Sequence, residues 1–171
     1  WDNFSVPGIW EVKGYGTPIY VNQRYEWDYL IKPEPGVLPD TLNHVGLYRR
    51  EVNIPQNWDK KQVYIHFGAV ASNLYLWVNG KFVGYSEDSK LDTQFDITPY
   101  LKKGKNLISF QVYRWSDGKY VESQDFWRLS GVSRDVYLFA RNQEHIDDIF
   151  VQAGLNNNYT DGVLKLNTEV K

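Results

Sequence analysis

The alternation of apolar and polar positions along the chain predicts a fold built from short β-strands. From residue 46 onward, apolar side chains recur at every second position in short segments that Gly, Pro or Asn residues separate, which is typical of half-buried strands. No segment shows the periodicity of about 3.6 residues that a long amphipathic helix requires. The predicted strands are 46–54, 62–70, 73–78, 81–85, 106–113, 134–139, 146–153 and 163–170.

The turn residues between these segments agree with an all-β sandwich or jelly roll. Asn79-Gly80 separates two predicted strands and favours a tight hairpin, because both residues tolerate positive φ. Thr98 is expected to be the N-cap of one helical turn that has Pro99 at its first position and ends at Gly104.

Two units are expected along the chain. Residues 1–142 contain enough predicted strands for a sandwich, whereas the two strands within 143–171 cannot close a sandwich of their own. The second unit is therefore expected to be the truncated start of another β domain. The chain begins at Trp1 and contains no Met, so we expect it to be a piece of a longer protein whose signal peptide, if any, lies upstream.

Composition narrows the classes of function. The chain has 171 residues, of which 42% are hydrophobic, and a net charge of −2, which argues against nucleic acid or an anionic membrane as the main partner. The absence of Cys excludes disulfides and thiolate metal sites. Aromatic residues reach 16%, which favours a β-rich core, with stacking on sugar rings as the alternative.

The 114–136 segment, RWSDGKYVESQDFWRLSGVSRDV, is the strongest candidate for a site. It is a long polar stretch between two predicted strands, and ordering such a stretch is costly unless it builds something. Glu122 and Asp125 could form a hydrolytic pair with carboxyls about 5–5.5 Å apart, but a hydrogen-bonding role is favoured over catalysis. For Asp125, a contact to sugar hydroxyls and an ion pair with Arg128 or Arg114 are equally open.

Other candidate chemistry is weaker. Asp117 precedes Gly118, which favours a turn residue over a ligand of Mg²⁺ or Ca²⁺. A second acidic loop at 87–89 could share such a metal site. The three histidines are widely spaced in sequence, and neither a metal cluster nor a Ser-His-Asp triad is favoured.

Four motifs together resemble a known family. PIYVNQRYEW (18–27), GLYRREV (46–52), LWVNGKFVGYSEDSKLDTQFDIT (76–98) and the 114–136 segment resemble, in this order, the N-terminal domain of family 2 glycoside hydrolases of the large β-galactosidase type. The resemblance implies a jelly-roll, galactose-binding-domain-like sandwich and then an immunoglobulin-like domain that starts near residue 143. It places the two catalytic glutamates in a downstream (β/α)8 barrel outside this chain, so none of this chain's carboxylates is expected to be catalytic.

The resemblance also implies site residues. Asn22 of the PIYxN motif and Asp125 of the QDxW motif are expected to contact galactose hydroxyls, and Asp125 is expected to ligate Na⁺ as well. Asp117 and Glu87 match two positions of a peripheral Mg²⁺ site, although Glu87 stands where relatives have glutamine. The other ligands of that ion lie upstream of this chain in the family, so the site is expected to be incomplete here.

The resemblance implies a retaining β-galactosidase that hydrolyses terminal β-D-galactosides such as lactose, assembles as a homo-oligomer, and lies in the bacterial cytoplasm, in the periplasm or outside the cell. The chain alone is expected to be inactive. The alternatives are a β-glucuronidase or β-mannosidase domain of the same family, a stand-alone carbohydrate-binding module, or a structural domain for oligomer assembly. Trp115 and Trp127 are expected to pack inside and fix the 114–136 segment.

Overall fold

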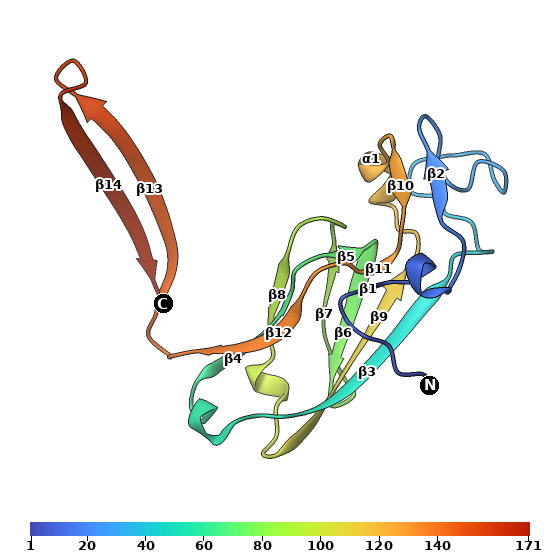
Figure 1. The fold of residues 1–171 in the computed structure, drawn as a ribbon. Coiled ribbons are helices and arrows are strands. Elements are labelled where there is room, and N and C mark those ends of the chain that lie inside the picture. The colour runs from blue at the N-terminus through green and yellow to red at the C-terminus, as the bar shows by residue number, and fades with distance from the viewer.

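A computed structural model describes all residues, 1–171, and the fold is all-β with very little helix (Figure 1). The helical elements are the α-helix α1 (Lys119–Glu122) and the 3-10 turns η1 (Glu11–Lys13), η2 (Gln56–Trp58) and η3 (Thr98–Tyr100). The strands are β1 (Gly8–Ile9), β2 (Ile19–Val21), β3 (Val45–Asn53), β4 (Gln62–Phe67), β5 (Val70–Ala71), β6 (Asn73–Val78), β7 (Lys81–Glu87), β8 (Thr93–Asp96), β9 (Lys105–Tyr113), β10 (Phe126–Arg128), β11 (Gly131–Val132), β12 (Val136–Arg141), β13 (Ile146–Asn156) and β14 (Asp161–Val170).

Two antiparallel sheets form the body of the molecule. One has the strand order β3-β9-β6-β7, and the other has the order β12-β4-β8. Alternate residues of the central strands are buried, as expected for strands with one face on a core. The hydrophobic cluster draws on both sheets, and its members include Val63, Ile65 and Phe67 of β4, Leu74, Leu76 and Val78 of β6, and Ile108 and Val112 of β9.

Most predicted strands are confirmed, with small differences at their ends. The predicted strand 62–70 is instead divided into β4 and β5, which belong to different sheets, and one cap prediction is wrong. Asn79 and Gly80 join β6 to β7 with φ of 52° and 80°, as the hairpin requires. Thr98 is not an N-cap. Its hydroxyl instead accepts a hydrogen bond from the backbone N–H of Val63 on β4 (2.8 Å), while the Asp96 carboxylate accepts from the N–H of Thr98 (2.9 Å).

Small pairings join the beginning of the chain to its later part. β1 pairs with β11, and β2 pairs with β10, so the irregular first 40 residues are held by strands from the 114–136 segment. That segment is therefore not one continuous loop, because it contains α1, β10 and β11.

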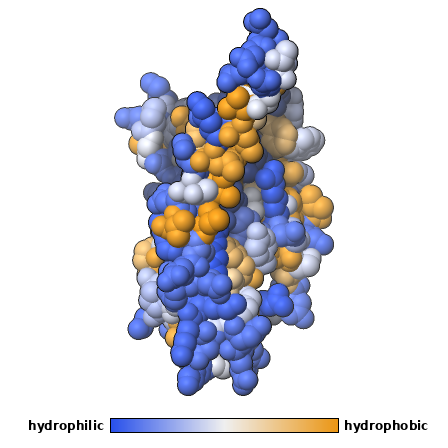
Figure 2. All heavy atoms as spheres, turned by 90° about the vertical axis from the view of Figure 1, so that its left-hand side faces the viewer, coloured by the Kyte–Doolittle hydropathy of each residue, from blue (hydrophilic) through white to orange (hydrophobic).

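The hairpin of β13 and β14 projects away from the body as an isolated ribbon (Figure 1). Val151 lies opposite Leu166, and Ala153 lies opposite Leu164, so these apolar side chains share one face of the ribbon. Gln152 lies opposite Lys165 on the other face. Figure 2, viewed from the hairpin side, shows hydrophobic atoms gathered along this ribbon. The ribbon is amphipathic, and its apolar face is exposed.

None of the helices has the length and apolar character needed to span a bilayer.

Candidate functional site

The strands β2 and β10 form a short ribbon beside α1 (Figure 1). Phe126 lies opposite Val21, and Trp127 lies opposite Tyr20. The next position on each strand beyond this ladder is Asp125 on β10's side and Asn22 on β2's side. The ribbon therefore brings together the two residues to which the resemblance assigns sugar contacts, although most of the domain separates them in sequence.

One face of the ribbon combines aromatic rings with a carboxylate. The Tyr20 hydroxyl donates a hydrogen bond to Oδ1 of Asp125, and the Tyr20 and Trp127 rings meet edge to face with centroids 5.7 Å apart. Tyr20 is 54% exposed and Trp127 is 51% exposed. Since Oδ2 of Asp125 and the exposed Asn22 amide lie beside these rings, the face can both stack against a sugar and hydrogen-bond to its hydroxyls.

The exposure of Trp127 corrects one prediction. Trp115 is buried as expected, at 1% exposure, but Trp127 lies on the open face of the ribbon. The strand pairing explains the difference, because a side chain opposite Tyr20 on a two-stranded ribbon has no second layer to pack against.

The protonation of Tyr20 is set by its neighbour. The hydrogen bond to Asp125 raises the pKa of Tyr20 above its ordinary value, and desolvation and the negative charge of Asp125 raise it further. The phenol therefore keeps its proton at neutral pH and remains a donor to the carboxylate.

A buried polar cluster around Glu26 lies next to the ribbon. The Trp115 indole donates to Oε2 of Glu26 (2.7 Å), and the Trp115 and Trp27 rings lie with centroids 5.4 Å apart. Arg114 Nε lies 3.8 Å from Oε2 of Glu26, and Lys119 Nζ lies 3.9 Å from Oε1. One carboxylate thus serves an indole and two cations in the interior.

Arg128 connects this interior to the ribbon. Its buried guanidinium donates through Nη2 to the carbonyl of Val21 (3.3 Å), the residue just before Asn22. Burial lowers the pKa of Lys119, with Glu26 and Glu122 opposing the shift and Arg128 contributing to it. The buried charged side chains beside the ribbon therefore include more cations than anions.

Glu122 and Asp125 have separate partners. Glu122 accepts hydrogen bonds from Ser89, through Oε1 from the backbone N–H (2.9 Å) and through Oε2 from the hydroxyl. Asp125 reaches Tyr20 instead. The two arginines considered as ion-pair partners of Asp125 lie elsewhere: Arg114 is beside Glu26, and Arg128 reaches Val21. The structure therefore does not form the ion pair that was the alternative to a sugar contact.

Glu87 and Asp117 are neighbours, but they do not complete a metal site. Glu87 accepts from the backbone N–H of Gly118 (2.8 Å) and from the Tyr85 hydroxyl (2.7 Å). Burial raises the pKa of Glu87, but the hydrogen bonds that it accepts, among them those from Gly118 and Tyr85, outweigh this effect and hold the pKa below its ordinary value. No group of three His, Cys, Asp or Glu side chains suited to a metal exists in the molecule.

For Na⁺, the chain offers the carboxylate of Asp125. With Oδ1 bound to Tyr20, its other oxygen Oδ2 can face a cation on the exposed side. A hard cation needs several oxygen ligands, so a sodium ion here would need oxygens from a bound sugar, from water or from another part of the protein.

The histidines take no part in the ribbon. His66 lies 3.7 Å from Asp92 and stacks on Tyr137. His145 lies 3.4 Å from Asp147 near the base of the hairpin.

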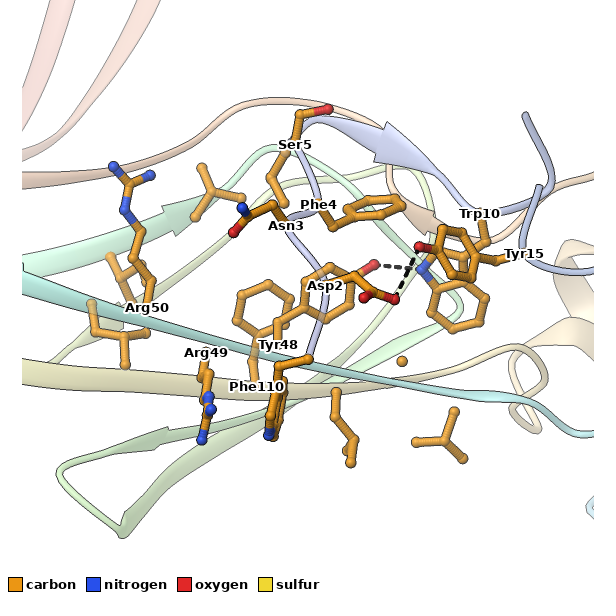
Figure 3. A pocket seen from close by; sticks show the side chains of 18 of the residues that line it. Asp2, Asn3, Phe4, Ser5, Trp10, Tyr15, Tyr48, Arg49, Arg50 and Phe110 are labelled. Carbon is orange, nitrogen blue, oxygen red and sulfur yellow. Dashed lines mark hydrogen bonds between the residues drawn. The ribbon is translucent and has the colours of Figure 1, made fainter. Parts of the chain in front are cut away.

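A cavity of about 1540 Å³, drawn in Figure 3, is lined by no residue of this ribbon. It opens between residues 1–6 and β3, where the Phe4 and Tyr48 rings meet edge to face and the Trp10 indole donates to the Tyr48 hydroxyl. Its floor includes Ile65 and Ile108 of the core. We attribute it to the open edge of the sandwich, which the N-terminal segment covers.

Two residues near the ribbon escaped the sequence reading. Glu26 carries no pattern, because an acidic residue in an irregular stretch is normally a solvated one. Tyr20 lies within the motif 18–27, but the sequence assigns it no role. The WRLSG stretch shortly after Asp125 could have indicated the strand β10. Its partner β2 could then have been sought among the short apolar runs of the first 40 residues.

Comparison with known proteins identifies the family of this chain. Residues 1–142 match the family described as glycosyl hydrolases family 2, sugar binding domain. A β-galactosidase of Priestia megaterium is 47% identical over 99% of this chain, and one of Halalkalibacterium halodurans is 42% identical over all of it. The chain spans only 16% and 17% of the lengths of these two relatives.

Solved structures share the fold. A calcium-binding mutant of Bacteroides uniformis β-glucuronidase 2 aligns over 100% of this chain and 19% of its own, with a TM-score of 0.75 and 23% identity. A β-glycosidase from Bacteroides vulgatus aligns over 98% of this chain and 20% of its own, with a TM-score of 0.70 and 26% identity. The family match and the β-galactosidase relatives lead to one conclusion: this chain belongs to glycosyl hydrolase family 2 and carries its sugar-binding domain.

Proposed function

We propose that this chain binds the galactosyl group of a β-D-galactoside through Asn22 and Asp125, within a retaining β-galactosidase that hydrolyses terminal galactosides such as lactose. The observation that carries the proposal is the register of β2 and β10, which places these two residues at adjoining positions. Their exposure leaves both free for a ligand. The identity of 39–47% to β-galactosidases favours galactose over glucuronate or mannose.

The proposed division of labour leaves bond cleavage to another part of the protein. In this chain Glu122 accepts from Ser89 and Asp125 accepts from Tyr20, so these two carboxylates are not paired with each other as acid and nucleophile roles would require. We therefore assign the catalytic glutamates to a (β/α)8 barrel and expect the 171-residue chain alone to be inactive. Its affinity for galactose should be weak, because half of the pocket would be missing.

The side chains of this chain suit a Na⁺ site better than a Mg²⁺ site. Asp125 Oδ2 suits Na⁺ in an oxygen-rich site that a bound sugar would help to complete. For Mg²⁺, Asp117 and Glu87 supply two neighbouring carboxylates, but hydrogen bonds already engage both oxygens of Glu87.

We further propose that residues 1–142 are a jelly-roll, galactose-binding-domain-like unit and that 143–171 begin an immunoglobulin-like one. The apolar face of the β13–β14 ribbon supports this division, since a sandwich needs a second sheet over such a face. That sheet would come from chain beyond residue 171.

The test uses the complete protein and a chromogenic galactoside. Asp125→Ala and Asn22→Ala should each lower kcat/KM about 10- to 100-fold, the size expected for hydrogen bonds to a charged group or to a fixed polar ligand. Asp59→Asn is the matched control, because Asp59 is exposed and lies beside η2, away from the ribbon. Wild-type turnover by Asp125→Ala would exclude the proposed site.

The rival function is a stand-alone carbohydrate-binding module, which the exposed Tyr20 and Trp127 rings favour. Titration of galactose into the 171-residue chain by NMR separates the two. Binding at millimolar galactose or tighter, lost in Asp125→Ala, would favour the module.

A further inference from the structure

We propose that Tyr20 is a positioning residue of the sugar site: its phenol holds the Asp125 carboxylate in one orientation, with the unengaged oxygen Oδ2 presented to the ligand. The proposal rests on the sugar-binding role of Asp125 proposed above. It adds Tyr20 to Asn22 and Asp125 as a residue of that site.

The geometry carries the first step. Tyr20 is on β2 and Asp125 immediately precedes β10, and the hydrogen bond from the Tyr20 hydroxyl to Oδ1 crosses the ribbon between them. The Tyr20 ring is in turn fixed by Trp127, which lies directly opposite it with the ring centroids 5.7 Å apart and the planes inclined at 62°. The phenol is therefore held on both sides, by a ring contact and by a carboxylate.

The hydrogen bond between Tyr20 and Asp125 orients the carboxylate rather than stabilising the fold. Tyr20 is more than half exposed, and Asp125 is exposed. An exposed hydrogen bond adds little to the stability of the fold, because water replaces either partner. It does restrict a motion that matters for a ligand, since the torsion that turns an aspartate carboxylate is otherwise broad.

The third step is chemical. A carboxylate with both oxygens free can bind a sugar hydroxyl or a cation in several ways, whereas one whose Oδ1 accepts from a phenol is fixed in orientation and has Oδ2 as its unengaged oxygen. The phenol is neutral at assay pH and retains lone pairs on its own oxygen. The ligand thus meets a fixed pair of oxygens, one charged and one neutral, beside the Asn22 amide.

The test compares Tyr20→Phe, Asp125→Ala and the double variant in the complete protein. The probe is a non-hydrolysable β-thiogalactoside, whose Kd is measured by calorimetry, together with kcat and KM for a chromogenic galactoside. Tyr20→Phe keeps the ring against Trp127 and removes only the hydroxyl. Tyr15→Phe is the matched control, because Tyr15 is also an exposed tyrosine whose hydroxyl donates to an aspartate, Asp2 (3.5 Å), away from the ribbon.

Tyr20→Phe should raise the Kd about 3- to 10-fold, the range for loss of one hydrogen bond that orients a binding group. KM should rise with it, kcat should change less than about twofold, and the unfolding transition should not move. Tyr15→Phe should match the wild type. In the Asp125→Ala background, Tyr20→Phe should cause no further loss, because its effect runs through Asp125.

The outcomes separate the two proposals. If Tyr20→Phe has the wild-type Kd while Asp125→Ala has a raised Kd, the positioning role alone is overturned. An undiminished effect of Tyr20→Phe in the Asp125→Ala background also overturns it, because the phenol would then act independently. A normal Kd in Asp125→Ala overturns the sugar site itself.

Discussion

Trp115 donates its indole N–H to the Glu26 carboxylate at 2.7 Å, and both side chains are almost completely buried. The bond ties the irregular N-terminal part of the chain to the 114–136 segment. It also explains how a buried carboxylate is tolerated, since Arg114 and Lys119 lie within 4 Å of its two oxygens.

Removing the charge of Glu26 should be strongly destabilising. Glu26→Ala leaves Arg114 and Lys119 buried without their counter-charge and the Trp115 indole without its acceptor. We expect a loss of about 3–5 kcal/mol in the free energy of unfolding, measured by urea denaturation. Glu34→Gln, a change at an exposed position, should cost less than about 0.5 kcal/mol.

The buried Lys119 should give stability a specific dependence on pH. Its pKa is lowered in the folded state by burial, so between that lowered pKa and the ordinary lysine value of about 10.5 the unfolded chain binds more protons. The free energy of unfolding should therefore rise with pH across this window. The difference between wild type and Lys119→Met, measured by denaturation at several pH values, isolates the contribution, and a flat difference would contradict the burial of a charged amine.

Asn79 should matter more for its amide than for its turn. Its Nδ2 donates to the Tyr100 carbonyl (2.9 Å) and to the buried Asn106 (2.8 Å), and its Oδ1 accepts from the N–H of Leu107 (3.0 Å). Asn79→Gly keeps the positive φ and loses these bonds, and we expect a loss of about 2–3 kcal/mol. A melting temperature equal to that of the wild type would show that the turn alone is needed.

The apolar face of the β13–β14 ribbon should make the 171-residue chain associate. Leu166 and Val151 are exposed there, and such a face on a free ribbon favours self-association. Sedimentation velocity should show an apparent mass that rises with concentration. Leu166→Lys should abolish the rise without changing the melting temperature, whereas Lys165→Leu, which extends the apolar surface to the polar face, should increase it.

The sequence predicted the strands that have a regular pattern and missed those that are too short to have one. The strand 73–78 was predicted with the bounds of β6, because apolar positions alternate there and a turn follows. β8 has only four residues, and β5 and β11 have two each, so their existence depends on partners far along the chain. No local pattern encodes such partners.

The candidate site, too, was predictable from the sequence only in part. The 114–136 segment stood out as a costly polar stretch, but Asn22 entered only through the family resemblance. The link between Asn22 and Asp125 is a matter of strand register, which three-residue strands specify weakly in sequence. Tyr20 and Glu26 depend on that same register and on the interior beside it, so neither could be recognised before the fold was known.

The pairing of β2 with β10 sets the order in which the site can arise during synthesis. Ile19–Val21 leave the ribosome early and must wait, unpaired, until Phe126–Arg128 have followed. The sheet β3-β9-β6-β7 can assemble in the interval, since all its strands precede β10. The other sheet waits longer, because β4 pairs with β12, which follows β10 in the chain. A chain interrupted before β10 would therefore hold one complete sheet, but it would lack both the proposed sugar-binding ribbon and the β12 edge of the second sheet.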